Sequence, residues 1–252
     1  MTTSASSQPA LATAAETLAE PASRHILTFK PRRGRITTAQ AGALDRLWPR
    51  WGFEIPADAG ERAPLDVAAL YGRLAPLQLE IGCGMGDAVI AMAAACPEQD
   101  FLAVDVHTPG LGNVLRLAER AGLTNVRAAA GDALDLLRWQ FTADSLDAVH
   151  IYFPDPWPKA RHHKRRIIRP DVTALLADRL RPGGSLYCAT DWAEYAEEML
   201  AVLTAEPRLD NRHPGFAPRP AHRPVTKFEA RALLEGREVF DLSFTKNSCT
   251  KN

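Results

Sequence analysis

The sequence predicts a doubly wound α/β fold with a mostly parallel sheet. Strand-like and helix-like segments alternate from Leu77 onward, which is the pattern of βαβ units. A glycine-rich turn, "GCGMG", follows the first of these strands, and several strands end at an acidic residue. The chain has 252 residues, which suits one large domain better than two small ones. We therefore expect a single domain over residues 37–246.

The first three predicted strands surround the glycine turn. Leu77–Gly84 is an apolar strand that runs into the turn, and Asp87–Cys96 has the apolar spacing of a helix. The second strand, Asp100–Val106, precedes the helix Gly112–Leu123, which ends near a glycine. The third strand, Asn125–Ala133, ends near a Gly-Asp pair.

The second half of the domain continues the alternation. Ser145–Phe153 is the fourth predicted strand, and the helix Arg169–Gly184 is expected to stop at its two glycines. The strand Ser185–Asp191 then leads into the helix Trp192–Glu206. Val239–Lys246 supplies at least one more strand. No internal repeat or linker divides the domain.

The two ends of the chain differ from the domain in composition. Residues 1–23 are rich in Ala, Ser and Thr without an apolar face, so a disordered tail is expected. Residues 24–36 form a basic arm that contains "KPRRGR", and Thr38–Trp51 predicts a short helix that caps the domain. Residues 247–252 are expected to form a C-terminal tail.

Composition indicates a soluble protein. The hydrophobic fraction of 46% is ordinary, and 30 basic residues balance 30 acidic ones, so only the distribution of charge can indicate a polyanionic partner. No apolar run has membrane-spanning length, and the first residues resemble neither a secretory signal nor a transit peptide. We expect a cytoplasmic protein without a membrane partner; its oligomeric state stays open, a monomer included. The four cysteines are expected to be reduced because they form no CxxC pair: Cys83, Cys96, Cys188 and Cys249.

Four successive strands end at or near a carboxylate, and ligands of parallel sheets bind at these carboxyl ends. The four residues are Glu80, Asp105, Asp132 and Asp155. Asp105 is placed to accept hydrogen bonds from ribose hydroxyls, and Asp132 to reach an adenine amino group. Asp132 is alternatively the N-cap of a helix.

The glycine turn favours S-adenosylmethionine over a dinucleotide. Gly82, Gly84 and Gly86 form G-x-G-x-G, whereas the dinucleotide motif is G-x-G-x-x-G. Glycines let the backbone approach a ligand closely. Glu80 would repel a pyrophosphate and suits a ligand that carries an amine or sulfonium cation.

The segment "YFPDPWPKARHHKRR" joins a rigid loop to a run of cations. The prolines at 154, 156 and 158 are expected to hold Phe153, Asp155 and Trp157 in an extended, stiff conformation. Six cations follow: Lys159, Arg161, Lys164, Arg165, Arg166 and Arg169. A phosphate backbone is the natural partner of such a surface, and a merely solvated face is the alternative.

Other residues are expected to extend this cationic surface. The basic arm, Arg212, Arg219 and Arg223 are the candidates. His162 and His163 are not expected to hold a metal, because no third ligand accompanies them.

Four segments, in this order, resemble bacterial tRNA (guanine-N7)-methyltransferases: "LEIGCGMG", "VHIYFPDPWPKARHHKRR", "ATDW" and "RPVTKFEAR". The resemblance covers about Arg32 to Leu242. It implies a Rossmann-like class I methyltransferase fold with an antiparallel C-terminal strand, S-adenosylmethionine as cofactor, and a guanine in the variable loop of tRNA as substrate.

The resemblance also assigns roles to residues. Glu80, Asp105, Asp132 and Asp155 would contact the cofactor, with Asp155 also at the active centre. The residues that would face the substrate are Lys159, Asp191, Thr226, Lys227, Phe228 and Glu229. Trp157 and Phe228 can stack on a base or belong to the core, and Asp191 can contact substrate or cap a helix.

Guanine N7 carries a lone pair and no proton, so a general base is unnecessary. We expect Asp155 to position the base and to stabilise the positive charge that develops on it.

Three residues depart from the family pattern. Cys83 replaces an aromatic residue, Asp105 is shorter than the expected glutamate, and Ala232 replaces a glycine. Three alternative functions remain: an amino-methyltransferase that acts on adenine or cytosine of RNA, an RNA-binding protein without catalysis, and a methyltransferase for small molecules.

Overall fold

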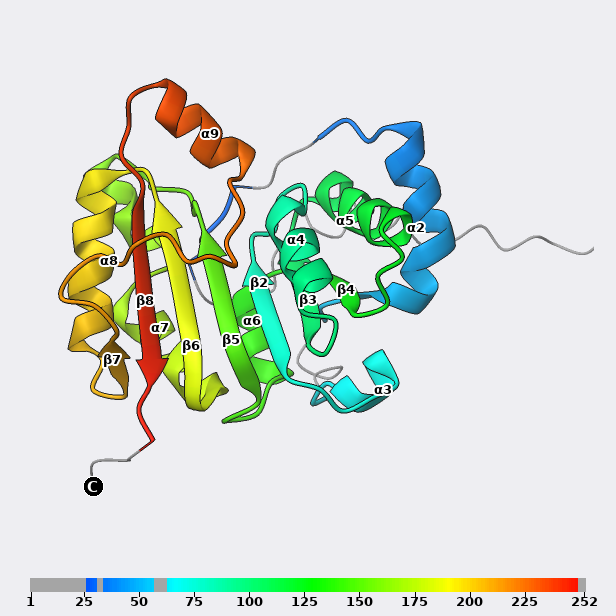
Figure 1. The fold of residues 1–252 in the computed structure, drawn as a ribbon, viewed down its shortest axis with the longest axis horizontal. Coiled ribbons are helices and arrows are strands. Elements are labelled where there is room, and N and C mark those ends of the chain that lie inside the picture. The colour runs from blue at the N-terminus through cyan, green and yellow to red at the C-terminus, as the bar shows by residue number, and fades with distance from the viewer. Residues whose placement is uncertain (1–25, 31–33, 57–62, 249–252) are drawn as a thin grey trace, which may run out of the picture.

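An eight-stranded sheet, in the order β1-β4-β3-β2-β5-β6-β8-β7, forms the centre of the computed structural model (Figure 1). The structure describes residues 26–30, 34–56 and 63–248. The expected N-terminal tail, Arg32 and Arg33 of the basic arm, and Cys249 lie outside these residues. The strands are β1 (Gly52–Glu54), β2 (Leu77–Ile81), β3 (Asp100–Asp105), β4 (Val126–Ala130), β5 (Leu146–Tyr152), β6 (Leu180–Thr190), β7 (Leu209–Asn211) and β8 (Phe240–Lys246).

The pairing confirms a doubly wound, mostly parallel sheet with antiparallel C-terminal strands. Strands β1 to β6 pair in parallel, and β8 runs antiparallel to both β6 and β7. The helices are α2 (Thr38–Trp51), α3 (Val67–Tyr71), α4 (Asp87–Ala95), α5 (Thr108–Arg120), α6 (Ala133–Trp139), α7 (Pro170–Arg179), α8 (Ala193–Ala205) and α9 (Lys227–Leu234). A short 3-10 helix, η2 (Ala160–Arg165), follows the proline loop.

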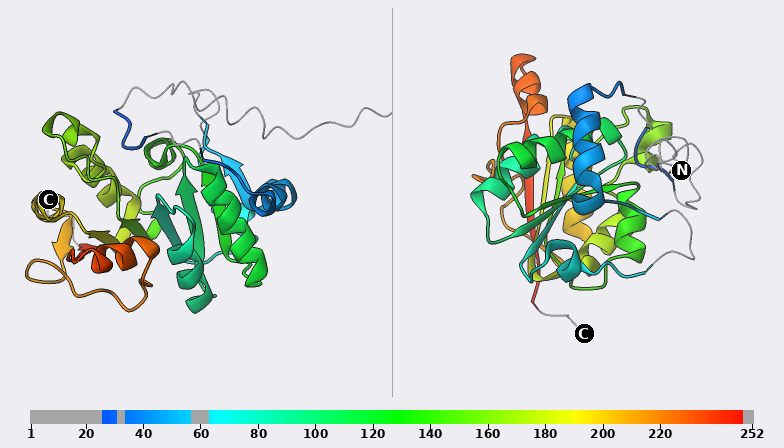
Figure 2. Two further views of the ribbon diagram at one scale, coloured as in Figure 1. Left: turned by 90° about the horizontal axis from the view of Figure 1, so that it is seen from above. Right: turned by 90° about the vertical axis from the view of Figure 1, so that its right-hand side faces the viewer.

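Two apolar cores lie on the two faces of the sheet. Helices α6, α7 and α8 pack on one face, and α2, α4 and α5 on the other. In β3, Leu102 and Val104 belong to the first core, whereas Phe101 and Ala103 belong to the second. Because side chains alternate along a strand and both faces are covered, β3 is apolar from Phe101 to Val104, between its terminal aspartates. Helix α2 lies against α5 at one side of the molecule (Figure 2).

The sheet face of β5, β6 and β8 on the α4 side is crossed by the segment between β7 and α9 (Figure 1). This segment bridges to β8 through Ala217 and Asp241. It leads into α9 beside the carboxyl end of the sheet.

Some element boundaries differ from the sequence prediction. The helix expected to continue to Gly184 ends at Arg179, and residues 180–184 begin β6. Leu180 is fully buried and pairs with Leu146, which gives this segment its strand geometry. A Cβ on Gly184 would lie 3.1 Å from the carbonyl oxygen of Leu146, so this glycine permits close strand contact. Helix α5 starts at Thr108, before the predicted Gly112.

Five short elements were not predicted: β1, α3, η2, β7 and α9; α6 was anticipated only through the alternative that Asp132 caps a helix. Each is three to eight residues long, so each offers little periodicity to recognise. The cysteines at 83, 96 and 188 are free thiols, as expected.

The contact between α5 and the glycine turn gives a stability prediction. A Cβ on Gly110 would lie 2.1 Å from the carbonyl oxygen of Gly84, and a backbone atom cannot move aside cheaply. We expect Gly110→Ala to lower the free energy of unfolding by about 1 to 3 kcal/mol, measured by urea denaturation.

Gly42→Ala is the matched control. Gly42 lies inside α2, and its Cβ would meet only the flexible end of Arg46, at 3.4 Å. This substitution should stabilise the protein by up to about 1 kcal/mol, because alanine favours the helix. Equal stability of the Gly110 variant and the parent would show that α5 does not constrain the turn.

Candidate active site

A cavity of about 660 Å³ opens at the carboxyl ends of the parallel strands. The strand ends of β2, β3, β4 and β5 all contribute to its walls, together with α9 and part of the basic arm. Its predicted lining residues are Gly82, Gly84, Asp105, Asp132, Asp155 and Phe228. The tertiary structure therefore brings together three of the four strand-end carboxylates.

The glycines of the turn meet two different structural requirements. Gly82 and Gly84 adopt φ of 75° and 55°, and a Cβ on Gly82 would meet no atom within 4 Å. Gly82 therefore faces open space in the cavity. Gly86 does not line the cavity; a Cβ there would lie 2.6 Å from Cγ2 of Val114 in α5. Gly86 therefore permits close packing of the turn against α5, and its predicted cofactor contact stays a prediction.

Asp105 fixes the shape of the glycine turn. Its Oδ2 accepts a hydrogen bond from the Gly84 backbone N–H at 2.8 Å, and its Oδ1 accepts one from His107 N–H at 2.9 Å. Burial raises the pKa of the Asp105 carboxyl, and these two backbone donors act in the opposite direction. His107 also lines the cavity. His107 is not among the residues predicted from the sequence, although its place just after a strand end indicates such a position.

Asp132 caps a helix and also lies at the wall of the cavity. Its Oδ1 accepts a hydrogen bond from Leu134 N–H at 2.9 Å, so it is the N-cap of α6. The same residue lines the cavity. A cap at this point orients the carboxylate toward the strand end.

Glu80 is buried behind the cavity and does not line it. Only 4% of its surface is exposed, and in β2 it pairs with His150 of β5. The pKa of Glu80 is raised to about 8, chiefly by burial; a backbone hydrogen bond from Val89 lowers it, and the negative charges of Asp105 and Asp87 contribute to the rise. Its Oε2 has no hydrogen-bond partner among the described residues. A buried carboxyl oxygen without a donor is costly, so this atom marks a place for a donor or cation.

The proline loop bends where the sequence predicts extended backbone. Phe153 and Trp157 have φ of 51° and 47°, in the left-handed region, on either side of Asp155. Such a conformation costs roughly 1 to 2 kcal/mol for each residue other than glycine. At the start of the loop, Phe153 N–H donates to the Ala189 carbonyl at 2.7 Å. Asp155 is thus held in a turned loop, where it lines the cavity.

Trp157 is a buried anchor for the basic arm. Its indole N–H donates to the Thr28 carbonyl at 3.2 Å, and Cζ of Arg165 lies 4.0 Å from the centroid of the indole ring. Arg165 also donates to the backbone carbonyls of Leu27 and Phe29. The arm residues 28–30 consequently form one wall of the cavity. Only 3% of Trp157 is exposed, so it does not offer its ring to a base.

The run of cations divides into exposed and engaged side chains. Lys159, Arg161 and Lys164 are exposed. Arg169 pairs with Asp171 at 2.7 Å. Arg166 is fully buried against two glutamates, so the prediction that it contacts RNA phosphate is wrong for the structure as it stands.

Arg223 is a second arginine for which an exposed cationic role is wrong. It is buried and donates to both oxygens of Asp241 at 2.8 Å and to Glu229 of α9. Arg212 and Arg219, in contrast, are exposed. Glu229, predicted to face the substrate, instead ties α9 to β8 through Arg223.

Helix α9 presents Phe228 at the mouth of the cavity. Thr226 is the N-cap of this helix and accepts a hydrogen bond from Glu229 N–H at 3.3 Å. Phe228 is 47% exposed, and its ring centroid lies 6.3 Å from that of Phe153 with an interplanar angle of 22°. Lys227 is exposed beside it. The sequence left open whether Phe228 is a core residue or an exposed aromatic residue, and the structure shows that it is exposed.

Asp191 does not cap helix α8. The N-cap is Trp192, and the Asp191 carboxylate forms an ion pair with Arg237, which follows α9. This ion pair joins the end of β6 to the α9 segment.

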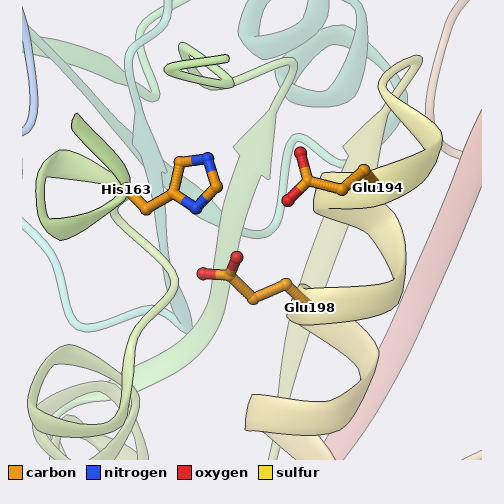
Figure 3. Close-up of side chains that lie close together, drawn as sticks. All are labelled: His163, Glu194 and Glu198. Atoms are coloured by element: carbon orange, nitrogen blue, oxygen red, sulfur yellow. The ribbon is translucent and has the colours of Figure 1, made fainter. Parts of the chain in front are cut away.

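Three groups able to ligate a metal lie close together on η2 and α8 (Figure 3). They are His163, Glu194 and Glu198, whose ligand atoms lie within 4.8 Å of one another. The expectation that no third ligand accompanies the histidines is therefore wrong for His163. Arg166 already donates to both glutamates, so its guanidinium supplies a cation at this cluster.

Comparisons with known proteins identify the family. A family model described as "Putative methyltransferase" matches residues 74–242. A tRNA (guanine-N(7)-)-methyltransferase from Streptomyces avermitilis is 54% identical over 234 residues, which cover 90% of this chain and 79% of the relative. The protein of the same name from Halorhodospira halophila is 51% identical over 223 residues, which cover 88% and 95%. The chain belongs to the tRNA (guanine-N7)-methyltransferase family.

A solved structure supports the fold assignment. The crystal structure of the 16S rRNA methyltransferase KamB has a TM-score of 0.54 and 16% sequence identity. The similarity covers 73% of this chain and 95% of that chain. This chain thus shares its fold with that methyltransferase despite the low sequence identity.

The departures from the family pattern fit the structure. Cys83 is buried below the glycine turn, and Ala232 is fully buried in α9. Asp105, although shorter than glutamate, still reaches two backbone donors. Within the described ranges, no helix of this family member is long and apolar enough to cross a membrane.

The burial of Glu80 predicts a pH-dependent stability in this family member. Its pKa is about 8 in the folded chain against 4.5 for an ordinary glutamate. Between these values the folded chain retains a proton that the unfolded chain loses, so stability falls as pH rises through this window. Each unit of pKa difference corresponds to about 1.4 kcal/mol.

Glu80→Gln removes this titration. The unfolding free energy of the variant relative to the parent should rise between pH 5 and pH 8, measured by urea denaturation without cofactor. Glu197→Gln, at an exposed carboxylate of α8, is the control and should show a constant difference. A constant difference for Glu80→Gln as well would contradict the assignment.

Proposed function

We propose that this chain methylates N7 of a guanine in the variable loop of tRNA, with S-adenosylmethionine as the methyl donor. The observation that carries the proposal is a cavity with a glycine turn and carboxyl groups directly beside a loop that continues into exposed cations. Membership of the tRNA (guanine-N7)-methyltransferase family supports it.

The cavity residues fit S-adenosylmethionine. Open space in front of Gly82 admits a ligand close to the backbone, and the unpartnered Oε2 of Glu80 lies behind the same turn. A positively charged ligand would favour the ionised form of Glu80, whose burial alone disfavours it. Asp105 and Asp132 would hold the ribose and adenine groups, as the sequence predicts. When bound, S-adenosylmethionine supplies an electrophilic methyl group on a sulfonium sulfur.

Asp155 and Phe228 would act on the guanine. Phe228 is half exposed at the cavity mouth and can stack on a base that leaves the RNA helix. Asp155 can accept hydrogen bonds from the N–H edge of the base and stabilise the positive charge that develops on the purine. No proton has to leave N7, so positioning and electrostatics suffice.

The exposed cations beside this loop would bind the RNA backbone. Lys159, Arg161 and Lys164 follow Asp155 within ten residues and are open to solvent. Lys227 is also exposed, next to Phe228, which lines the cavity. A polyanion held by these side chains would present a nucleotide to the cavity.

The decisive experiment incubates the purified chain with labelled S-adenosylmethionine and unmodified tRNA, followed by nucleoside analysis. We expect 7-methylguanosine. Labelled N6-methyladenosine or a methylated cytosine would support the amino-methyltransferase alternative, and the absence of label in RNA would contradict the proposal.

Asp155→Asn tests the role of the loop carboxylate. The amide keeps the shape but removes the charge, so single-turnover methylation should slow by roughly 100-fold or more. The dissociation constant of the cofactor, measured by calorimetry, should change much less. Near-normal single-turnover methylation would refute the role of Asp155.

Salt dependence tests the RNA surface. The affinity for tRNA should fall steeply with salt, and Lys159→Ala/Lys164→Ala should reduce the slope of log K against log salt by roughly 1 to 2. Arg50→Ala/Arg120→Ala is the charge-matched control, because both side chains are exposed at helix ends away from the cavity. Equal slopes for the two double variants would place the RNA elsewhere.

A further inference from the structure

Arg166 lies in the cationic run, yet it is fully buried and its guanidinium donates four hydrogen bonds. Its Nε donates to the Pro156 carbonyl at 2.9 Å. Its Nη1 and Nη2 donate to the two carboxylate oxygens of Glu194 at 3.0 and 2.9 Å, and Nη1 also donates to Glu198. One side chain thus ties the proline loop to the first two turns of α8.

The bond to Pro156 acts on the residue next to Asp155. Asp155 is flanked by Phe153 and Trp157, both in the left-handed region. A loop with two such residues relaxes unless its surroundings hold it. The prolines restrict the local dihedral angles, but they donate no hydrogen bonds that would fix the loop against the rest of the fold. Arg166 supplies such a bond from outside the loop.

The acidic partners of Arg166 belong to the segment that carries Asp191. Helix α8 begins at Ala193, and the Trp192 indole N–H donates to Glu194 at 3.3 Å. Glu194 is therefore fixed three residues after Asp191. Arg166 therefore connects the loop that carries Asp155 to the segment that carries Asp191 through direct hydrogen bonds.

The groups around Arg166 match the permanent positive charge of its guanidinium. Hydrogen bonds from Arg166 lower the pKa of Glu194 to about 2, so Glu194 stays ionised in neutral solution. The ring of Tyr195 lies 4.7 Å from Cζ of Arg166, and the Tyr195 hydroxyl accepts a hydrogen bond from Ile168 N–H. His163 faces the same glutamates (Figure 3), but the guanidinium is their direct hydrogen-bond partner. Arg166 thus satisfies the two glutamates of the cluster, whereas Nε2 of His163 is buried and has no hydrogen-bond partner among the described residues.

We propose that Arg166 is a positioning residue for Asp155, which it holds in register with the Asp191 end of β6 by clamping the Pro156 carbonyl to Glu194 and Glu198. The proposal rests on the proposed function only where its readout is methyl transfer. It predicts that Arg166 influences catalysis without touching RNA.

Arg166→Lys tests the clamp. Lysine keeps the positive charge but cannot reach Pro156, Glu194 and Glu198 at once. We expect kcat for tRNA methylation to fall by roughly 10- to 100-fold, because a small displacement of a group at the reaction centre slows the chemical step. KM for tRNA and the slope of log K against log salt should stay nearly unchanged. A raised KM with normal kcat and a smaller salt slope would instead make Arg166 an RNA contact and overturn the proposal.

Arg73→Lys is the matched control for lost stability. Arg73 also joins a buried carboxylate, Asp100, to backbone carbonyls, those of Pro97 and Gln99, but at the start of β3. The substitution Arg73→Lys should lower the melting temperature of the protein without changing kcat. An equal fall of kcat in both variants would reduce Arg166 to a structural role.

A double-variant cycle separates action through Asp155 from independent action. If Arg166 works through Asp155, adding Arg166→Lys to Asp155→Asn should slow single-turnover methylation by less than about threefold further. Full multiplication of the two effects would contradict the proposal.

Hydrogen exchange gives a readout that does not depend on activity. Peptides that contain residues 151–165 should exchange faster in Arg166→Lys than in Arg73→Lys, whether or not the parent produces 7-methylguanosine. If Arg166→Lys does not fold, Glu194→Gln weakens the same clamp at a largely exposed residue and should accelerate exchange of the same peptides. Unchanged exchange in the folded variant would overturn the clamp, whereas an inactive parent with the expected exchange would refute only the proposed function.

Discussion

Parallel pairing of β2 with β3 on one side and with β5 on the other is the constraint from which the candidate site follows. Parallel strands end at the same edge of a sheet, so the glycine turn after β2 and the proline loop after β5 must meet there. Residues 80 and 155 lie 75 positions apart in the chain, yet the pairing places their segments side by side. The antiparallel strand β8 lies between β6 and β7, and the α9 segment that precedes it reaches the same edge.

The site is built from groups that are unfavourable in isolation. Glu80 is a buried carboxyl with an unpartnered oxygen, and Phe153 and Trp157 adopt left-handed backbone conformations. The apolar cores on both faces of the sheet provide the stabilisation that makes these features tolerable. Their concentration around one cavity is typical of a site preorganised for a charged ligand.

The basic run shows how one stretch of sequence serves two purposes. Lys159 and Lys164 point to solvent on the 3-10 helix, whereas Arg165 and Arg166 turn inward and hold the arm and the proline loop. Arginine suits the inward positions because its planar fork can bind several acceptors at once. The proposed RNA surface and the proposed positioning of Asp155 thereby belong to the same short segment, so a bound polyanion would lie directly beside the proline loop.

The sequence by itself determined which residues follow the carboxyl ends of the strands. The glycine turn, Asp105, Asp132 and Asp155 could all be predicted at one sheet edge, because βαβ spacing implies parallel strands whose carboxyl ends lie together. It also determined the family, through segments whose residue types are specific. The tertiary structure alone decided which charges are exposed. Arg166 and Arg223 cannot be distinguished from their exposed neighbours along the chain, since their partners Glu194 and Asp241 come from distant elements. Burial depends on packing between such elements, and a local pattern of charges does not encode it.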